Sequence, residues 1–210
     1  MTTKTQTRKK LLTTANMTRI SVLSAIAVIL MLAEFLKIRV IPHMYTLDFS
    51  NLPVLLGAFA MGPAAGMVIL ALKEVIHLLF QGIAENNAVG NLADFIMSAA
   101  YILPASLLYM KNKTRKNAVL GMTLGTGFIT VFGIIANWLI LLPFYTLVCG
   151  YPMESIVSAV GAVFPFVTSE AKLLIYFVGP FNLVKGLAIS VVTFLIYKPL
   201  SPVLHSKARR

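Results

Sequence analysis

Long apolar stretches separated by short polar loops make up most of this chain. A membrane-spanning helix needs about 20 mostly apolar residues, because it rises about 1.5 Å per residue through a hydrocarbon core of about 30 Å. The expected apolar segments run over residues 20–36, 50–61, 64–80, 91–110, 118–142 and 173–197. The Gly62-Pro63 turn leaves the second segment too short to cross unaided, and Pro143 and Pro199 are expected to end the last two. The pattern predicts an all-α integral membrane protein with six transmembrane helices, the second one short.

Composition and charge support a membrane protein. Apolar residues make up 58% of the chain and charged residues only 12%, and the mean hydropathy is +0.85. The net charge of +11 is concentrated in three basic clusters that border apolar segments, over residues 4–19, 111–116 and 198–210. This distribution is typical of cytoplasmic loops under the positive-inside rule, and the absence of interleaved aromatic residues argues against nucleic-acid binding. Six crossings then place the N- and C-termini on the cytoplasmic side of the cell membrane.

One domain is expected over residues 1–210, with basic tails at about 1–16 and 199–210, because the sequence shows no repeat and no soluble domain. The N-terminal region is basic and then apolar, as in a signal peptide. No small-x-small cleavage site follows Met31, so we expect a retained first helix. The stretch from Pro143 to Lys172 is expected to be a long loop. The single cysteine, Cys149, excludes an internal disulfide and a cysteine zinc cluster.

Four polar residues lie within apolar segments: Asn91, Asn137, Asn182 and Lys185. A polar group in hydrocarbon is costly unless a bundle interior or a wet cavity satisfies it. Asn182 and Lys185 are three residues apart and therefore share a helix face. An asparagine amide both donates and accepts hydrogen bonds, and a lysine ammonium only donates. Together these residues predict an internal pocket for a small molecule with a polar edge.

Each of these residues also has a simpler interpretation. Asn91 suits a cap at the expected start of the fourth helix, and Asn137 suits a hydrogen bond that only joins helices. Asn182 suits a bond to the backbone of a neighbouring helix, while Lys185 suits snorkelling to the outer surface. Asp48, like Ser50, suits an N-cap of the short helix, although the backbone amides there also suit a ligand contact.

The remaining ionisable residues do not form a recognisable catalytic site. Lys73 is expected to pair with Glu74 or to snorkel, and His77 to lie near a helix end at the outer surface. Asp48 and Asp94 are the carboxylates expected near the pocket. The three histidines have no ligand spacing for zinc, and the chain lacks a Gly-x-Ser-x-Gly nucleophile motif and a Walker A sequence. The pattern argues against an enzyme, and a small membrane enzyme acting on lipids would need acidic or histidine clusters that are missing.

Four sequence blocks resemble a known family. They are Tyr-Thr-Leu-Asp-Phe-Ser-Asn-Leu-Pro at 45–53, Phe-Ala-Met-Gly-Pro-Ala-Ala-Gly at 59–66, Asn-Trp-Leu-Ile-Leu-Leu-Pro-Phe-Tyr at 137–145 and Pro-Phe-Asn-Leu-Val-Lys-Gly at 180–186. In this order they resemble riboflavin-specific S components of energy-coupling factor (ECF) vitamin transporters. The likeness covers about residues 17–200.

The resemblance implies a bacterial plasma-membrane subunit that captures riboflavin from outside. It also implies a membrane coupling subunit and two cytoplasmic ATPases as partners, with riboflavin as transported ligand rather than cofactor. Flavin contacts are implied for Asn137, Asn182 and Lys185, and for Thr46 and Leu47 of the first loop. An S component for another vitamin, such as thiamine or a pterin, is the alternative. An inward-facing lysine argues against cationic thiamine.

The resemblance further implies a docking face on the first helix. The family carries an alanine-x-x-x-alanine pair there, and the nearest match is Ser21 and Ala25, a spacing that lets helices approach closely. A flat flavin ring also needs an apolar slot. Leu47, Trp138 and Tyr145 are the expected walls of that slot.

Overall fold

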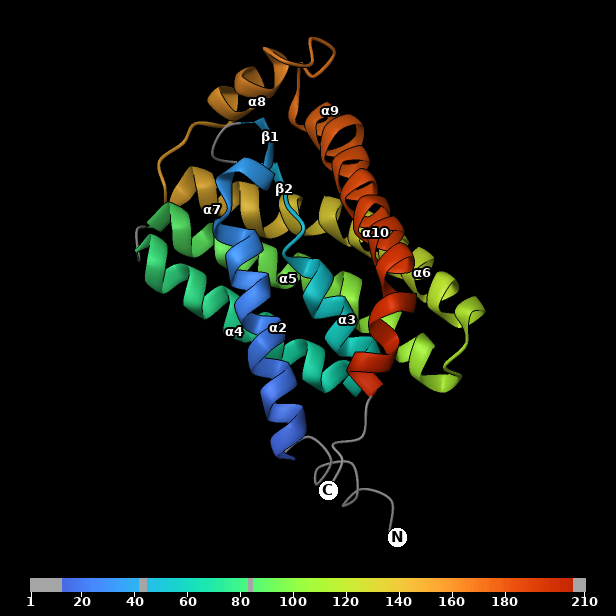
Figure 1. The fold of residues 1–210 in the computed structure, drawn as a ribbon. Helices are drawn as coiled ribbons and strands as arrows, with labels where there is room; N and C mark the ends of the chain where they lie inside the picture. The colour runs from blue at the N-terminus through green and yellow to red at the C-terminus, as the bar shows by residue number, and fades with distance from the viewer. Residues whose placement is uncertain (1–12, 42–44, 83–84, 206–210) are drawn as a thin grey trace, which may run out of the picture.

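The computed structural model describes residues 13–41, 45–82 and 85–205. Within this part of the chain, five helical spans are long and apolar enough to cross a membrane: Thr14–Leu32, Pro63–Gln81, Ala88–Lys111, Arg115–Leu147 and Glu170–Tyr197. The first three correspond to α2 (Thr14–Leu32), α4 (Pro63–Gln81) and α5 (Glu85–Lys111). A shorter apolar helix, α3 (Asn51–Met61), lies among them in Figure 1. The expectation of a helical membrane protein with one short helix is confirmed.

The short helix α3 is buried in protein rather than exposed to lipid. Its 11 residues extend about 16 Å, roughly half of a bilayer core. All residues from Pro53 to Phe59 are buried, against α2, α4, α5 and α10. Gly62 ends the helix with a φ of 105°, a conformation that favours glycine, and Pro63 then opens α4. A half-length helix at membrane depth is tolerated when neighbouring helices surround it in this way.

The last two spans are composite helices, and here the expected ends are wrong. The fifth span joins α6 (Arg115–Ala136), the π-helical η2 (Asn137–Leu141) and α7 (Leu142–Leu147). The sixth joins α9 (Glu170–Lys172), the π-helical η3 (Leu173–Val178) and α10 (Gly179–His205). In each, a proline follows the π segment within two residues: Pro143 in α7 and Pro180 in α10.

Pro143 therefore does not end the fifth helix. It lies in the first turn of α7, where a missing backbone N–H is tolerated, and the wider π turn before it bonds the Leu142 N–H to the Asn137 carbonyl. Likewise Pro199 does not end the sixth helix, because α10 continues to His205. A proline inside a membrane helix removes one hydrogen bond without necessarily breaking the helix.

Two other boundaries differ from the sequence prediction. The first helix begins at Thr14 rather than at residue 20, since Thr13 caps it by accepting a hydrogen bond from the Asn16 backbone N–H at 3.4 Å. The fourth helix begins at Glu85, so Asn91 lies inside the helix and is not its cap. The predicted basic tails lie outside the described residues before residue 13 and beyond residue 205.

Two elements at one end of the bundle were not predicted. A hairpin pairs β1 (Ile38–Ile41) antiparallel with β2 (Tyr45–Leu47), and the expected long loop contains α8 (Met153–Gly161). Figure 1 places them at the top, opposite the start of α2, the α3–α4 turn and the end of α10. The 3₁₀ turn η1 (Glu34–Leu36) joins α2 to the hairpin, where a hydrogen bond from Lys37 lowers the pKa of Glu34 and Arg39 also bonds the Glu34 carboxylate.

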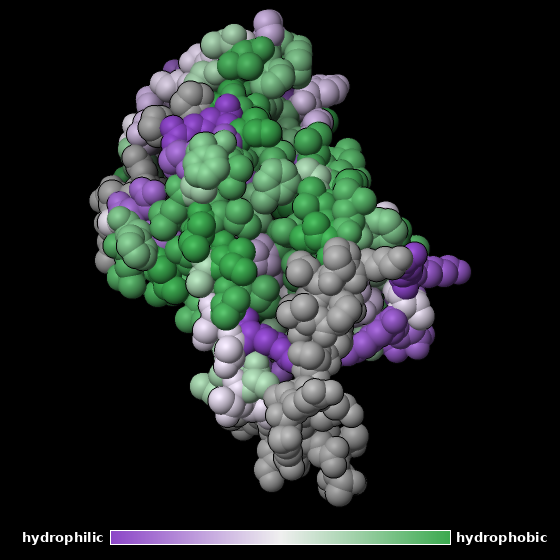
Figure 2. Space-filling model, viewed as in Figure 1, coloured by the Kyte–Doolittle hydropathy of each residue, from purple (hydrophilic) through white to green (hydrophobic). Residues whose placement is uncertain are grey.

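The outer surface of the helix bundle exposes many apolar side chains, as a surface in contact with lipid does. In Figure 2, hydrophobic residues cover the middle of this face, and hydrophilic ones gather at the upper left and toward the lower end. Exposed large apolar side chains occur on every long span, for example Val22, Val75, Leu107, Phe128 and Val191. The polar residues of the chain that are buried lie among the helices, and several of them contact one another.

Candidate ligand-binding site

A buried ion cluster joins α10 to α5 and to the first loop. The Lys185 ammonium lies 2.9 Å from Asp94 Oδ1 and 3.8 Å from Asp48 Oδ2. Lys185 is 7% exposed and is therefore held inside the bundle. Snorkelling of Lys185 to the outer surface is wrong, because two carboxylates hold its charge inside. Asp48 and Asp94, the carboxylates expected near the pocket, are the two that face Lys185.

Lys73 occupies the centre of the same cluster. Its ammonium donates to Ser50 Oγ at 3.1 Å, Asn51 Oδ1 at 3.0 Å and Asp94 Oδ2 at 2.6 Å. It also lies 2.8 Å from Glu74 Oε1. Lys73 is 0% exposed, so the predicted pairing with Glu74 is confirmed and the alternative of snorkelling is wrong. The start of α3 is thus tied to α4 and α5.

The first loop reaches the cluster through Asp48. Asp48 Oδ1 accepts a hydrogen bond from the Ser50 backbone N–H at 2.8 Å, at the entry to α3. The Asp48 side chain is therefore the polar group at this helix start, while the Ser50 hydroxyl makes no cap bond and faces Lys73 instead. The predicted N-cap role of Asp48 is wrong, because Ser50 is the N-cap residue and no side chain caps α3; Asp48 instead turns the chain into the helix and lies beside Lys185.

Two asparagine amides meet at Gly133 of α6. The Asn137 Nδ2 donates to the Gly133 carbonyl at 2.8 Å, and its Oδ1 accepts from the Tyr45 hydroxyl at 3.0 Å. The Asn182 Nδ2 donates to the Val178 carbonyl at 2.9 Å. A Cβ atom on Gly133 would lie only 2.6 Å from the Asn182 Nδ2, so the absence of a side chain there permits the close approach.

The hydrogen bonds of Asn137 and Asn182 bear on the simpler interpretation that each asparagine only joins helices. The donor of Asn182 bonds to its own helix, and no described bond runs from it to another helix backbone. Asn137 likewise bonds its own helix, and through Tyr45 it holds the hairpin. Both side chains are buried, 4% exposed each. Their carbonyl and amide groups therefore face the bundle interior.

The hairpin closes the top of this region. Tyr45 packs edge-on against Phe177 and Phe181, with ring centroids 4.9 and 5.4 Å apart. Thr46 is half-buried and pairs with Arg39 across the hairpin, and Leu47 is buried. The two predicted first-loop residues thus stand between Tyr45, which touches Asn137, and Asp48, which faces Lys185.

Asn91 is the one predicted site residue whose described contacts lie elsewhere. Its Oδ1 lies 2.8 Å from His77 Nδ1, and its Nδ2 donates to the Glu74 carbonyl at 3.2 Å. Asn91 therefore joins α5 to α4. It is close to the cluster along the chain, because Asp94 follows it by one helical turn. His77 lies in the last turns of α4, as expected, and is half-buried against this asparagine.

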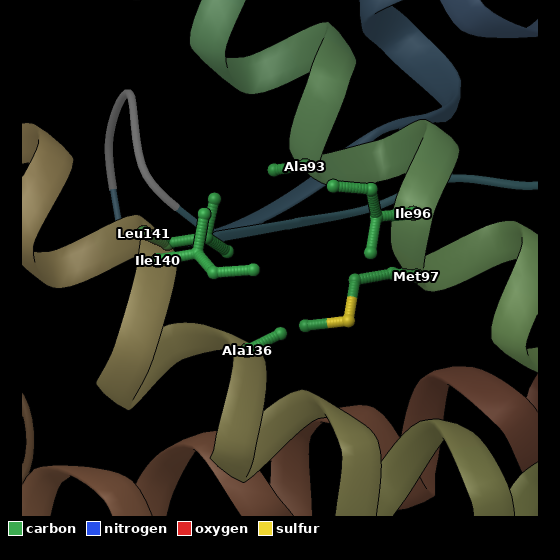
Figure 3. Close-up of a pocket in the computed structure, with 6 residues that line it drawn as sticks. All are labelled: Ala93, Ile96, Met97, Ala136, Ile140 and Leu141. Atoms are coloured by element: carbon green, nitrogen blue, oxygen red, sulfur yellow. The ribbon is translucent and has the colours of Figure 1, made fainter.

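A narrow apolar cleft lies near Gly133, between α5 and the fifth span. Figure 3 shows it between Ala93, Ile96 and Met97 of α5 and Ala136, Ile140 and Leu141 of the fifth span, with Met97 pointing toward Ala136. The Met97 methyl lies 3.3 Å from the position of a Cβ on Gly133, the same position that Asn182 approaches. All six lining side chains are apolar, and the amides of Asn137 and Asn182 are not among them.

The walls of this cleft differ from those the sequence suggested. Trp138 is 56% exposed and belongs to the outer surface, so its predicted place in the wall is wrong. Trp138 follows the buried Asn137 directly, and adjacent residues on a helix point in different directions, so the asparagine faces inward and its neighbour outward. Leu47 is buried and Tyr145 is half-buried in the core, and neither lines this cleft.

Sequence reasoning missed three contributors to this region. Lys73 was treated as a local ion pair, Tyr45 as part of a motif only, and Ser50 as a cap. The available signal was a lysine in the middle of an apolar segment, which is costly unless it has partners inside the bundle. Among the described residues, no group of three or more His, Cys, Asp or Glu side chains is arranged to hold a metal ion.

The first helix presents the predicted docking pair outward. Ser21 and Ala25 are both exposed on α2, while Leu23, Ser24, Ala27 and Val28 of the same helix are buried. Val22 and Ile26 flank the pair and are also exposed, at 52% and 42%. This face is apolar with two small residues at its centre.

Comparison with known proteins places the chain in a family. Residues 15–197 match the family model for the ECF transporter, substrate-specific component. The chain is 34% identical to "Riboflavin transporter FmnP" of Bacillus subtilis (strain 168), over 87% of this chain and 90% of that protein. It is 32% identical to "Riboflavin transporter RibU" of Staphylococcus aureus (strain TCH60), over 93% of this chain and 92% of that protein.

A solved structure agrees with these sequence matches. It is described as "Structure and mechanism of the S component of a bacterial ECF transporter", and it superposes with a TM-score of 0.66 at 31% identity, covering 90% of this chain and 97% of that one. The family match extends over every membrane span described above. The chain is therefore a multi-pass membrane protein that belongs to the family of ECF transporter substrate-specific components.

Proposed function

We propose that this protein binds riboflavin and delivers it for uptake as the S component of an ECF transporter. The observation that carries the proposal is that the buried amides of Asn137 and Asn182 both reach Gly133, while Lys185 lies one helical turn from Asn182. The edge of an isoalloxazine ring carries carbonyl acceptors and an N–H donor, and the rest of the ring is flat and apolar. Two amides and an ammonium match that edge, and an apolar slot matches the ring.

The first loop completes the proposed site. Thr46 and Leu47 lie on β2, between the Tyr45 contact with Asn137 and the Asp48 contact with Lys185. We assign these two residues and Asn91 to the rim of the site. Asn91 acts there by holding α5 against α4, one turn before Asp94. The relatives that are named riboflavin transporters make riboflavin the favoured ligand over other vitamins.

The cleft must widen for a flavin to enter. Pockets for ligands of this size have volumes of about 300–1,000 Å³, whereas this cleft encloses essentially no free volume. The hairpin is the element that covers the amides, through the Tyr45 hydroxyl bond and its aromatic contacts. The predicted topology places this end outside the cell, so capture occurs there.

Transport requires partners of the ECF module. We infer that these are a membrane coupling subunit and two cytoplasmic ATPases, and that the coupling subunit docks on the Ser21–Ala25 face of α2. Two small exposed residues one turn apart let another helix approach closely. The flanking apolar residues would be covered by that contact.

Titration of the purified protein tests the ligand. Riboflavin fluorescence is expected to be quenched as it enters the cleft, in one saturating phase, while an excess of thiamine leaves the curve unchanged. Riboflavin phosphate serves as a matched ligand with the same ring and an added charge. Absence of riboflavin quenching, or displacement of riboflavin by thiamine, would refute the proposed ligand.

A further inference from the structure

Lys73 is a fully buried cation that the proposed ligand contacts do not include. It lies in the middle of α4, at 0% exposure, between apolar turns of a membrane-spanning helix. A charge at this depth is expensive and occurs where it pairs with other groups. Its partners indicate what it does.

The three protons of the Lys73 ammonium are all used. They bond Ser50, Asn51 and Asp94, at 3.1, 3.0 and 2.6 Å. The bond to Asp94 reaches Oδ2, while the other oxygen, Oδ1, accepts from Lys185 at 2.9 Å. Asp94 is thus clamped between two ammonium groups from two helices, α4 and α10. The Ser98 hydroxyl also donates to Oδ2, at the longer distance of 3.4 Å, so Lys73 is the closer of the two donors to that oxygen.

A carboxylate held on both oxygens has a fixed orientation, whereas one held on a single oxygen rotates about its side-chain bonds. The orientation of Asp94 determines where the Lys185 ammonium lies, since Asp94 is the nearer of the two carboxylates that face it. We propose that Lys73 is a positioning residue for ligand binding, which fixes Asp94 and through it aims Lys185 at the ligand. The proposal rests on the proposed function, because riboflavin is the probe.

A paired substitution removes the Lys73 ammonium without leaving its carboxyl neighbour on α4 unmatched. The cluster holds three carboxyl groups, Asp48, Glu74 and Asp94, and two ammonium groups, Lys73 and Lys185. Lys73→Met removes one ammonium group, and Glu74→Gln replaces the adjacent carboxyl group by a neutral amide of similar size. The double variant Lys73→Met/Glu74→Gln therefore loses the bond from Lys73 to Asp94 and places two uncharged side chains in the cluster.

The experiment is a double-mutant cycle read by riboflavin titration. Lys73→Met/Glu74→Gln is expected to weaken riboflavin binding about 10-fold in the otherwise unsubstituted protein, within the range of coupled neighbouring residues. When Lys185 is already replaced by alanine, the same two substitutions are expected to change riboflavin affinity less than about twofold, because the residue that Lys73 positions is gone. Lys113→Met, an exposed lysine in the turn after α5, is the matched control and should bind normally.

The absorption spectrum of the bound flavin provides a second readout. Hydrogen bonds to the pyrimidine edge shift its visible bands, so loss of the clamp is expected to move the bound spectrum toward that of the Lys185→Ala protein. A role in folding alone would not change the spectrum of the flavin that does bind. If Lys73→Met/Glu74→Gln does not yield folded protein, Lys73→Gln/Glu74→Gln is the substitute, because glutamine retains an N–H donor toward Asp94. Its loss of riboflavin affinity is expected to depend on Lys185 in the same way and to be smaller.

The possible results distinguish failure of the positioning role from failure of the proposed function. Unchanged affinity and spectrum in the folded double variant, or equal affinity losses with and without Lys185, would overturn the positioning role while leaving riboflavin binding intact. Absence of riboflavin binding by the unsubstituted protein would instead refute the proposed function, and the inference with it. Loss of affinity that depends on Lys185 supports the inference.

Discussion

A single methyl group at Gly133 should disturb the proposed site without dismantling the fold. In Gly133→Ala the new Cβ would lie 2.6 Å from the Asn182 Nδ2 and 3.0 Å from its Cγ. Ordinary contact begins at 3.4 Å, so the amide must retreat by about 0.8 Å, the difference between 3.4 and 2.6 Å. The amide is the end of a rotatable side chain, so it moves more easily than the backbone of α6.

The expected loss of riboflavin affinity follows from the contacts that the displaced Asn182 amide gives up. Displacing the Asn182 amide weakens its bond to the Val178 carbonyl and removes it from the proposed ligand edge. A lost polar contact to a buried group costs about 1–3 kcal/mol, or roughly 5- to 150-fold in riboflavin affinity. Alanine also gains up to about 1 kcal/mol of helix propensity over glycine, which offsets much of the lost stability.

The assay compares two alanine substitutions on one helix. Gly127→Ala is the control, because nothing lies within 4 Å of the added Cβ. Both variants are purified, their thermal unfolding is measured, and riboflavin is titrated by fluorescence. We expect Gly127→Ala to bind like the parent protein and Gly133→Ala to remain folded with affinity reduced at least about fivefold. Equal affinities for both variants would refute the placement of Asn182 at the ligand.

Three further predictions address the site and the partner face. Lys185→Ala and Asn182→Ala should each weaken riboflavin binding roughly 5- to 150-fold while still inserting into the membrane; unchanged titration curves for both would remove the proposed site. Asn137→Leu should stay folded and lose affinity; normal binding by a thermally weakened protein would instead show that Asn137 only joins the hairpin to α6 through Tyr45. Ser21→Trp or Ala25→Trp should leave riboflavin titration unchanged but reduce co-purification with the ECF partners and cellular uptake, since a bulky ring prevents close helix approach; normal assembly and uptake would show that partners dock elsewhere.

The apolar spans could be predicted because the residues of each segment decide by themselves whether that segment leaves water. A run of about 20 apolar residues must leave water whatever it packs against, and a Gly-Pro turn cuts such a run in any fold. The short α3 and the burial of the polar residues in the spans followed from the same reasoning. The helix ends near Pro143 and Pro199 did not, since neighbouring turns decide whether a proline breaks a membrane helix.

The site itself depends on contacts between residues that are far apart in the chain. The sequence by itself determined which groups are too polar for lipid, among them Asn137, Asn182 and Lys185, and it left open whether Lys185 faced inward or snorkelled outward. Tertiary packing decided their partners. Lys185 meets Asp94 across 91 positions and Tyr45 meets Asn137 across 92, and no local pattern encodes such pairs. Burial is a property of one side chain and its solvent, whereas an ion pair needs two helices in a particular register; only the folded bundle supplies that register.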